Sequence, residues 1–357
     1  MNLHTSEALV VDLGSAHTRF YRPGVGVVID EPSIIAFRAE NGKVAAVGQE
    51  ARALTIRQPR GIRITRPLKE GTVADCDAAT QMLSGFIDRA LPQRTLTSLA
   101  LMVCVPAELT PLELIAYEDL ARRAGARKVT LVEAPFAVAN GADFDAGVRQ
   151  SRMVVDLGAG STDVAVSDHG NLLYASTRRV GGGEIDRNIV RYLQLERKLE
   201  VTLETAEEIK IKLARVEPSD DGRSMVVRGR NLMTGLPEEA TIESHEIHPL
   251  VEPALRVIKQ HIRRALEEIP IGVSVDLLDS GITLSGGLAL LPGLSESLSR
   301  ELTLAVRVIS NPMLAAVLGA GCLMERGARP SALEDGLESE NLDPSHRESS
   351  LAKVLKV

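Results

Sequence analysis

The chain contains nearly the same short segment twice, once near its beginning and once near its middle. VVDLGSAHT covers residues 10–18, and VVDLGAGST covers residues 154–162. In each copy, apolar β-branched residues lead to an aspartate, a leucine and a glycine, and small or hydroxyl residues follow. β-branched residues favour strands, and glycine favours tight turns. The repeat therefore predicts two similar halves, each with a strand that ends in the same kind of turn.

Strand-like and helix-like segments alternate along the chain. Short apolar runs predict strands at 8–14, 25–30, 33–37, 100–106, 129–133, 153–158 and 282–287. Apolar residues three and four apart predict amphipathic helices at 77–91, 111–125, 186–199, 205–216 and 251–269. After each repeated turn the chain again has a strand pattern, so we expect each turn to join two strands. The alternation predicts an α/β protein with buried sheets.

Composition narrows the class of protein further. The chain is 44% hydrophobic and can bury a large core, and its length of 357 residues favours two domains over one. The formal net charge of −7 disfavours a nucleic-acid-binding protein, because neutralising phosphates needs a surplus of basic residues. The cysteines Cys76, Cys104 and Cys322 are scattered, which favours a reducing cytoplasm over disulfides. Residues 326–357 are rich in Ser, Glu, Asp and Pro, which predicts a disordered acidic tail.

The residue types in the two turns suit phosphate binding. Asp12 and Asp156 end their strands, where a carboxylate can hold a hydrated Mg²⁺. The glycine that follows lets the backbone approach an anion, and the next residues offer N–H groups and hydroxyls to phosphate oxygens. The candidates are Gly14, Ser15, Ala16 and His17 in the first turn and Gly158, Gly160, Ser161 and Thr162 in the second. One such turn would fit a plain hairpin, but two matched turns predict a site for one nucleotide.

Four motifs resemble those of the actin-like ATPases, which include sugar kinases and chaperone ATPases, and they follow one another along the chain in the order found in that family. DLGSAHT (12–18) and DLGAGSTDVAV (156–166) resemble the two phosphate turns. VEAPFAVANGA (132–142) is similar to the first connecting helix, and SGGLALLPGL (285–294) to the adenosine turn. The segments EPSIIAF (31–37), RVGGGEID (179–186) and VRGRNLMTGLP (227–237) resemble in particular the MreB/Mbl family of bacterial actin homologues.

The resemblance implies an actin-like (ribonuclease H-like) α/β fold with two related domains that flank a nucleotide cleft, each with a smaller subdomain. We expect domain I at 1–145, with a helix near 312–325 packing back on it, and domain II at 146–311. The implied ligands are ATP or ADP with Mg²⁺. Besides the two turns, the resemblance assigns to the site Gly181, Gly182, Glu207, Glu208, Lys210, Gly286, Gly287 and Leu288.

The sequence departs from the family where hydrolysis is concerned. MreB proteins carry Glu-Glu-Pro before the connecting helix, and the carboxylate next to proline helps to position the attacking water. Ala134 stands at that place here, and Glu133, one residue earlier, points in a different direction on an extended segment. Thr162 in the second turn remains to orient water. We therefore expect slow ATP hydrolysis at most.

The resemblance implies a filament-forming cytoskeletal protein that acts in cell shape and in cell-wall or spore-wall morphogenesis. Its partners would be further copies of itself and wall-synthesis proteins. Two alternatives stay open, a phosphotransferase of the sugar-kinase type and a chaperone-like ATPase, neither of which polymerises. The expected location is the cytoplasm, at the inner face of the cell membrane. Membrane contact rests only on SSLAKVLKV (349–357), which has one apolar helical face.

Overall fold

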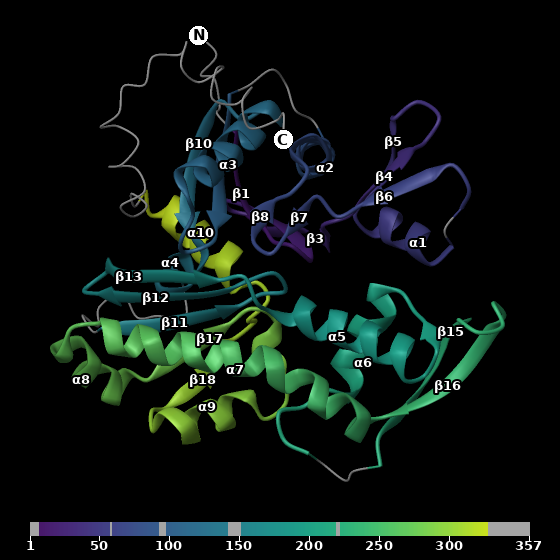
Figure 1. Cartoon of the computed structure of the whole chain (residues 1–357). Helices are drawn as coiled ribbons and strands as arrows, with labels where there is room; N and C mark the ends of the chain where they lie inside the picture. Colours follow the sequence, from purple (N-terminus) through teal and green to yellow (C-terminus); the bar gives the residue numbers. More distant parts are fainter. Residues whose placement is uncertain (1–6, 58, 93–97, 142–150, 219–221, 328–357) are drawn as a thin grey trace.

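The structure is a computed structural model that describes residues 7–57, 59–92, 98–141, 151–218 and 222–327. Figure 1 shows two halves, one above the other, and each half holds a five-stranded sheet at one side and a smaller part at the other. The strands at the centre of each sheet are the ones that carry the repeated segment. The predicted α/β class with two similar halves is therefore confirmed.

The sheet of the first half has the strand order β10-β9-β1-β2-β3. Its strands are β1 (Glu7–Leu13), β2 (His17–Arg22), β3 (Gly26–Pro32), β9 (Leu99–Val105) and β10 (Lys128–Glu133). β1 pairs in parallel with β9 and antiparallel with β2. The helices α2 (Cys76–Ala90) and α3 (Pro111–Arg123) bury apolar side chains against this sheet. Phe86 of α2 and Tyr117 of α3 are fully buried there, together with Phe20 of β2.

The smaller part of the first half is inserted between β3 and α2. It consists of β4 (Ile35–Arg38), β5 (Val44–Val47), α1 (Gln49–Arg57) and β6 (Ile62–Thr65), with a small apolar core of its own. The short pair β7 (Leu68–Lys69) and β8 (Thr72–Val73) leads back to the larger part.

The sheet of the second half has the order β13-β12-β11-β17-β18. Its strands are β11 (Arg152–Leu157), β12 (Thr162–Asp168), β13 (Asn171–Arg178), β17 (Ile282–Ser285) and β18 (Val306–Val308). β11 pairs in parallel with β17 and antiparallel with β12, as β1 does with β9 and β2. The two copies of the repeat thus hold the same place in their sheets.

The helices α7 (Ser244–Glu268), α8 (Ile271–Ser280) and α9 (Leu294–Leu302) belong to the larger part of the second half, with a short 3₁₀ helix at Gly287–Leu290. The smaller part consists of α5 (Gly182–Leu195), β14 (Leu199–Glu200), α6 (Leu203–Leu213), β15 (Ser224–Asn231) and β16 (Pro237–Glu243). None of the helices in the described part of the chain is long and apolar enough to cross a membrane.

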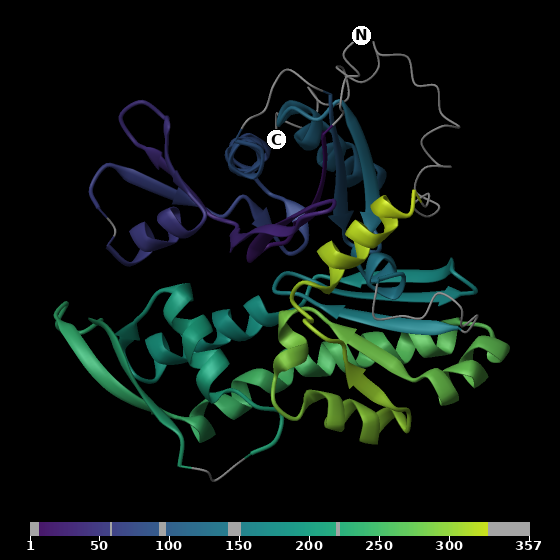
Figure 2. The same cartoon turned by 180° about the vertical axis from the view of Figure 1, so that it is seen from behind.

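Two helices connect the halves. α4 (Ala134–Ala139) leaves the first sheet, and α10 (Ala315–Glu325) returns from the second half to lie beside α4, β1 and β2 (Figure 2). Apolar residues of both helices share one core with Val10 and Val154 from the central strands of the two sheets. The expected domain boundary near 145 lies outside the described residues, as do nearly all of the expected tail and the candidate membrane segment at 349–357.

The predicted strands and helices are present, with shifts at some ends. α7 begins at Ser244, seven residues before the predicted start, and Pro249 and Pro253 lie inside it. A capping box between Glu243 and Glu246 stabilises this early start. α5 begins at Gly182, four residues before its predicted start, and Gly181 is its N-cap residue.

Candidate functional site

The two repeated turns have the same backbone geometry. The Gly14 N–H donates to the His17 carbonyl oxygen at 3.1 Å, and the Gly158 N–H donates to the Ser161 carbonyl oxygen at 2.9 Å. A Cβ on Gly14 would lie 2.8 Å from the His17 oxygen, so this turn requires glycine because of close backbone approach. Each turn joins two antiparallel strands, as the sequence predicts.

The turns approach each other across the gap between the halves. The Ser15 Oγ accepts a hydrogen bond from the Gly71 N–H at 3.1 Å. A Cβ on Gly160 of the second turn would lie 2.3 Å from the same Ser15 oxygen and 2.8 Å from the Gly71 nitrogen. Glycine at 160 thus lets the second turn come this close to the first.

Both turns line one cavity of about 460 Å³, a size typical of small-molecule sites. The cavity brings together most of the predicted site residues: Asp12, Gly14, Ser15, Ala16, His17, Ala134, Asp156, Gly158, Gly160, Ser161, Gly182, Glu207, Lys210, Gly286, Gly287 and Leu288. Four predicted residues are not in its lining: Glu133, Thr162, Gly181 and Glu208. Of these, Glu208 is exposed on α6.

The two strand-end aspartates are half-buried beside the cavity, and their environments differ. Burial raises the pKa of Asp156 to about 7; the nearby charge of Asp163 adds to the shift, and a hydrogen bond from the Ser285 hydroxyl at 2.7 Å opposes it. Burial also raises the pKa of Asp12, but the Arg19 guanidinium opposes this shift. Because burial disfavours a carboxylate without a partner, a cation bound here would favour the ionised form of Asp156.

Asp163 is a further carboxylate of the lining, fully buried, and the sequence analysis did not identify it. It accepts hydrogen bonds from the Ala107 N–H at 2.9 Å, the Thr177 hydroxyl at 2.6 Å and the Ser161 hydroxyl at 2.7 Å. Asp163 therefore holds the Ser161 side chain of the second turn in place and ties it to the segment after β9.

A divalent ion fits this site only with help from a ligand. No group of three or more His, Cys, Asp or Glu side chains suited to a metal occurs in the described residues. Asp12 and Asp156 line the cavity as two carboxylates on opposite turns. Two carboxylates are what Mg²⁺ commonly takes from a protein, with waters and phosphate oxygens completing its shell. The residues present thus fit a hydrated Mg²⁺ that accompanies a phosphate.

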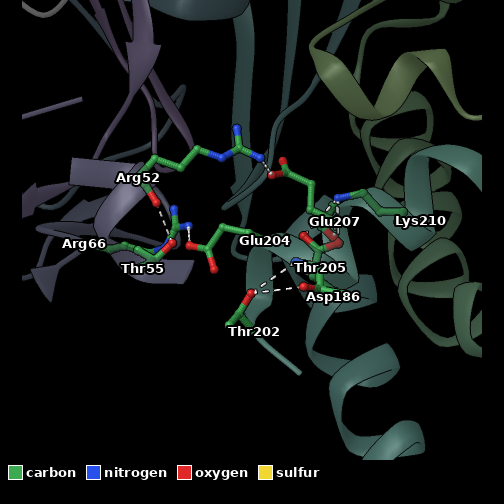
Figure 3. Close-up of polar contacts among 10 residues, drawn as sticks. Arg52, Thr55, Arg66, Asp186, Thr202, Glu204, Thr205, Glu207 and Lys210 are labelled. Carbon is green, nitrogen blue, oxygen red and sulfur yellow. Dashed lines mark hydrogen bonds and ion pairs between the residues drawn. The ribbon is translucent and has the colours of Figure 1, made fainter. Parts of the chain in front are cut away.

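Ion pairs join the two smaller parts beside the cavity (Figure 3). Arg66, just after β6, pairs with Glu204 at 2.6 Å, and Arg52 on α1 pairs with Glu207 at 3.4 Å. Both glutamates lie on α6 of the opposite half. The Lys210 ammonium, also from α6, contacts Asp186 at 2.9 Å and the Gly182 carbonyl oxygen at 3.2 Å. Glu207 and Lys210 therefore share one helix face, as their spacing predicts.

Glycines shape the other wall of the cavity. Gly286 has φ of 81°, and a Cβ there would lie 2.3 Å from the Leu157 carbonyl oxygen, so no other residue fits without displacement. At the start of α5, the Gly182 N–H donates to the Gly158 carbonyl oxygen at 3.0 Å, which docks the helix on the second turn. Gly181 supports this contact from outside the lining, since its Cβ would lie 2.4 Å from the same oxygen.

Of the three residues considered for hydrolysis, Ala134 lines the cavity and Glu133 and Thr162 do not. Ala134 begins α4 and lines the cavity, so the place of the expected carboxylate is occupied by a methyl group. Glu133 is 2% exposed and does not line the cavity. The Thr162 hydroxyl is buried and donates to the Val180 carbonyl oxygen at 2.8 Å, away from the lining.

The sequence analysis did not assign several residues of the cavity lining to the site. They include Arg19, Arg52, Gly71, Cys104, Tyr117, Asp163, Ile211 and Met313. For Arg19 a signal existed, because it follows His17 by two residues on one strand and shares its face. Arg52 and Gly71 come from the smaller part of the first half and its return, and no local pattern connects them to the turns.

The chain matches known proteins over most of its length. The family described as MreB/Mbl protein matches residues 6–331. The cell shape-determining protein Mbl of Bacillus subtilis (strain 168) is 36% identical over 315 residues, which cover 88% of this chain and 95% of the relative. The cell shape-determining protein MreB of Escherichia coli (strain K12) is 36% identical over 325 residues, with 90% of this chain and 94% of the relative covered.

Solved structures share the fold. MreB5 of Spiroplasma citri, in a crystal structure bound to ADP, superposes with a TM-score of 0.83 at 27% identity and covers 91% of this chain and 98% of its own. A MamK double helical filament gives a TM-score of 0.74 at 20% identity, with 89% of this chain and 99% of the MamK chain covered, and supports the fold alone. The fold is thus actin-like, and the chain belongs to the MreB/Mbl family.

Proposed function

We propose that this chain is a cell-shape-determining cytoskeletal protein that binds ATP or ADP between its two turns and assembles into filaments. The observation that carries the nucleotide proposal is the pair of matched turns on one cavity. The residues of both turns, Ser15 and Ser161 among them, line that cavity, and turns of this kind offer backbone N–H groups to phosphate oxygens. MreB5 of Spiroplasma citri has been crystallised with ADP and with AMPPNP, which supports the same ligand class here.

Each wall of the cavity has its own role in this proposal. The two turns hold the phosphates, while Gly286 and Gly287 on one side and Glu207 and Lys210 on the other hold the nucleoside. Asp12 and Asp156 would hold Mg²⁺ through water, and the ion would neutralise part of the phosphate charge. The ion pair of Arg52 with Glu207 joins the two halves at the cavity, because both residues belong to its lining.

Hydrolysis is proposed to be slow. Ala134 presents no carboxylate to the cavity, and the Thr162 hydroxyl already donates to a backbone oxygen. Without a positioned base, the loss is typically ~10²–10⁴-fold in rate. Binding is independent of this loss, because the groups that hold the phosphates are in place.

Nucleotide binding is tested by Gly160→Ala with calorimetric titration of ATP. The added Cβ would lie 2.3 Å from the Ser15 oxygen, so the two turns must separate, and we expect at least ~10-fold weaker binding. Gly272→Ala on α8 is the matched control, since nothing lies within 4 Å of its Cβ. Equal ATP affinity of the two variants, or no binding by the unaltered protein, would contradict the proposal.

Filament formation is supported by an uncovered apolar face on α8. Ile271, Val275 and Leu278 follow one another at spacings of four and three, and their exposed fractions are 85%, 57% and 64%. A patch that contacts a different patch on the next copy, without closure, produces a filament. The relatives named cell shape-determining proteins favour this class over a sugar kinase or a chaperone. The proposed location is the cytoplasmic face of the membrane, near wall-synthesis proteins.

The self-association proposal is tested by sedimentation with ATP over a range of protein concentrations. We expect the unaltered chain to pellet and Leu278→Asp to stay in the supernatant, because a carboxylate on this face resists burial. Leu195→Asp is the matched control, an exposed leucine (58%) at the end of α5 in the other part of the same half. Equal pelleting of both variants would exclude α8 as the contact, and a strictly monomeric unaltered chain would exclude filaments.

A further inference from the structure

A row of charged side chains crosses the first sheet beside the cavity. On β2, Phe20 faces the core, while Arg19 faces the opposite side. Arg19 is the direct cross-strand neighbour of Asp12 on β1 and of Asp30 on β3. Its Nη1 lies 3.4 Å from the Asp12 Oδ2, and its Nε lies 3.0 Å from the Asp30 Oδ1. The sheet thus holds one cation between two carboxylates.

This cation belongs to the cavity. Arg19 and Asp12 both line it, and the Arg19 side chain is 12% exposed. The other arginine and lysine of the lining as described, Arg52 and Lys210, come from the smaller parts and pair with acidic groups there. Arg19 is therefore the basic side chain that the structure places next to the strand-end aspartate of the first turn.

The Arg19 guanidinium has more N–H donors than its two ion pairs use. An arginine side chain has five N–H donors in a planar fork, a geometry that matches phosphate oxygens. Within the described residues, the ion pairs of Arg19 involve its Nε and Nη1, and the buried Nε has no hydrogen-bond partner. The 3.4 Å contact with Asp12 is longer than a strong charge-assisted bond, so it can give way to a better acceptor.

A nucleotide brings several negative charges to two carboxylates, Asp12 and Asp156, that also line the cavity. A positive charge has to offset this repulsion. A bound metal ion can supply that charge, and so can the side chain of Arg19, which lines the same cavity. We propose that Arg19 is a phosphate-binding residue that offsets the repulsion between Asp12 and the phosphates, so that nucleotide affinity is largely kept when divalent metal is removed. This inference rests on the nucleotide binding proposed above.

The experiment measures the dissociation constant of ATP for the full chain by calorimetry, once with excess MgCl₂ and once with EDTA. For the unaltered protein we expect less than ~10-fold weaker binding in EDTA. Arg19→Gln removes the charge at similar length, and we expect it to bind at least ~10-fold more weakly than the unaltered protein in EDTA. With Mg²⁺ the loss should be smaller, because the ion supplies charge. Arg19→Lys, which keeps the charge, should fall between the two.

The matched control is Arg123→Gln. Arg123 also pairs with an aspartate, Asp77 at 2.5 Å, but it lies on the surface of α3 and not in the cavity lining. The same charge change there should leave both affinities and their ratio unaltered. A role of Arg19 in folding alone would lower stability without changing the ratio of the EDTA and Mg²⁺ affinities.

Two results would overturn the inference: a loss of ~10-fold or more for the unaltered protein in EDTA, or ATP binding by Arg19→Gln in EDTA that equals that of the unaltered protein. The first needs no variant, so it decides even if Arg19→Gln fails to fold. ATP binding that occurs with Mg²⁺ but not with EDTA rejects the role of Arg19 and leaves the proposed function standing. No ATP binding under either condition rejects both.

Discussion

Replacing Gly319 with alanine tests the contact on which the two halves depend. Gly319 lies on α10 where this helix crosses α4. A Cβ there would lie 2.1 Å from the Ala137 oxygen, 2.6 Å from the Ala137 carbonyl carbon and 3.1 Å from the Val138 nitrogen. All three are backbone atoms, so no side chain can rotate away, and the helices must move apart.

Overpacking of this kind typically costs ~1–3 kcal/mol, against a gain of up to ~1 kcal/mol from the helix propensity of alanine. Because the added Cβ meets backbone atoms, its cost lies in the upper part of this range, and after the gain from alanine we expect Gly319→Ala to lower the free energy of unfolding by ~1–2 kcal/mol, measured by urea denaturation followed by circular dichroism. Gly272→Ala, a helical glycine with nothing within 4 Å of its Cβ, should be neutral or slightly stabilising. If Gly319→Ala is as stable as Gly272→Ala, the close crossing of α4 and α10 is wrong.

Two further predictions concern chemistry and pH. Ala134→Glu should raise the rate of phosphate release by ~10²-fold or more, because the added carboxylate acts mainly in the transition state. The affinity for ATP should change little. An unchanged rate would contradict the proposal that the missing carboxylate makes hydrolysis slow. His261 is 3% exposed, and burial lowers its pKa from 6.5 to about 4, so the folded state favours the neutral ring. Its contribution to stability is complete above pH 6.5 and falls as the pH drops towards 4; the free energy of unfolding should therefore fall by about 2 kcal/mol between pH 7 and pH 5. His261→Gln should remove this part of the pH dependence in urea titrations, and an equal slope in both proteins would contradict it.

The two turns and one face of α6 could be predicted from the sequence, because short-range residue patterns determine them. The two turns could be recognised because close backbone approach at Gly14 and Gly158 requires glycine next to a strand end, and that constraint appears in both copies. Glu207 and Lys210 could be placed on one face because helix geometry fixes the spacing of side chains three residues apart.

The positions of the other site residues depend on contacts between segments that are far apart in the sequence. Arg52 reaches the cavity because α1 lies opposite α6, and nothing near residue 52 in the sequence indicates this. Thr162 belongs to the second turn by sequence, but the structure points its hydroxyl to the Val180 carbonyl oxygen, because β12 begins at that residue and the side chain faces inward. Strand direction, which decides this, is fixed only when the sheet is formed.

The most direct test of the central claim is an experimental structure of the protein with AMPPNP and Mg²⁺. We expect the phosphates to lie between the turns at 14–17 and 158–161, with the adenosine beside Gly286 and α6. A nucleotide bound elsewhere, or phosphates in contact with one turn only, would contradict the conclusion that the repeated segment exists to hold a nucleotide from both sides.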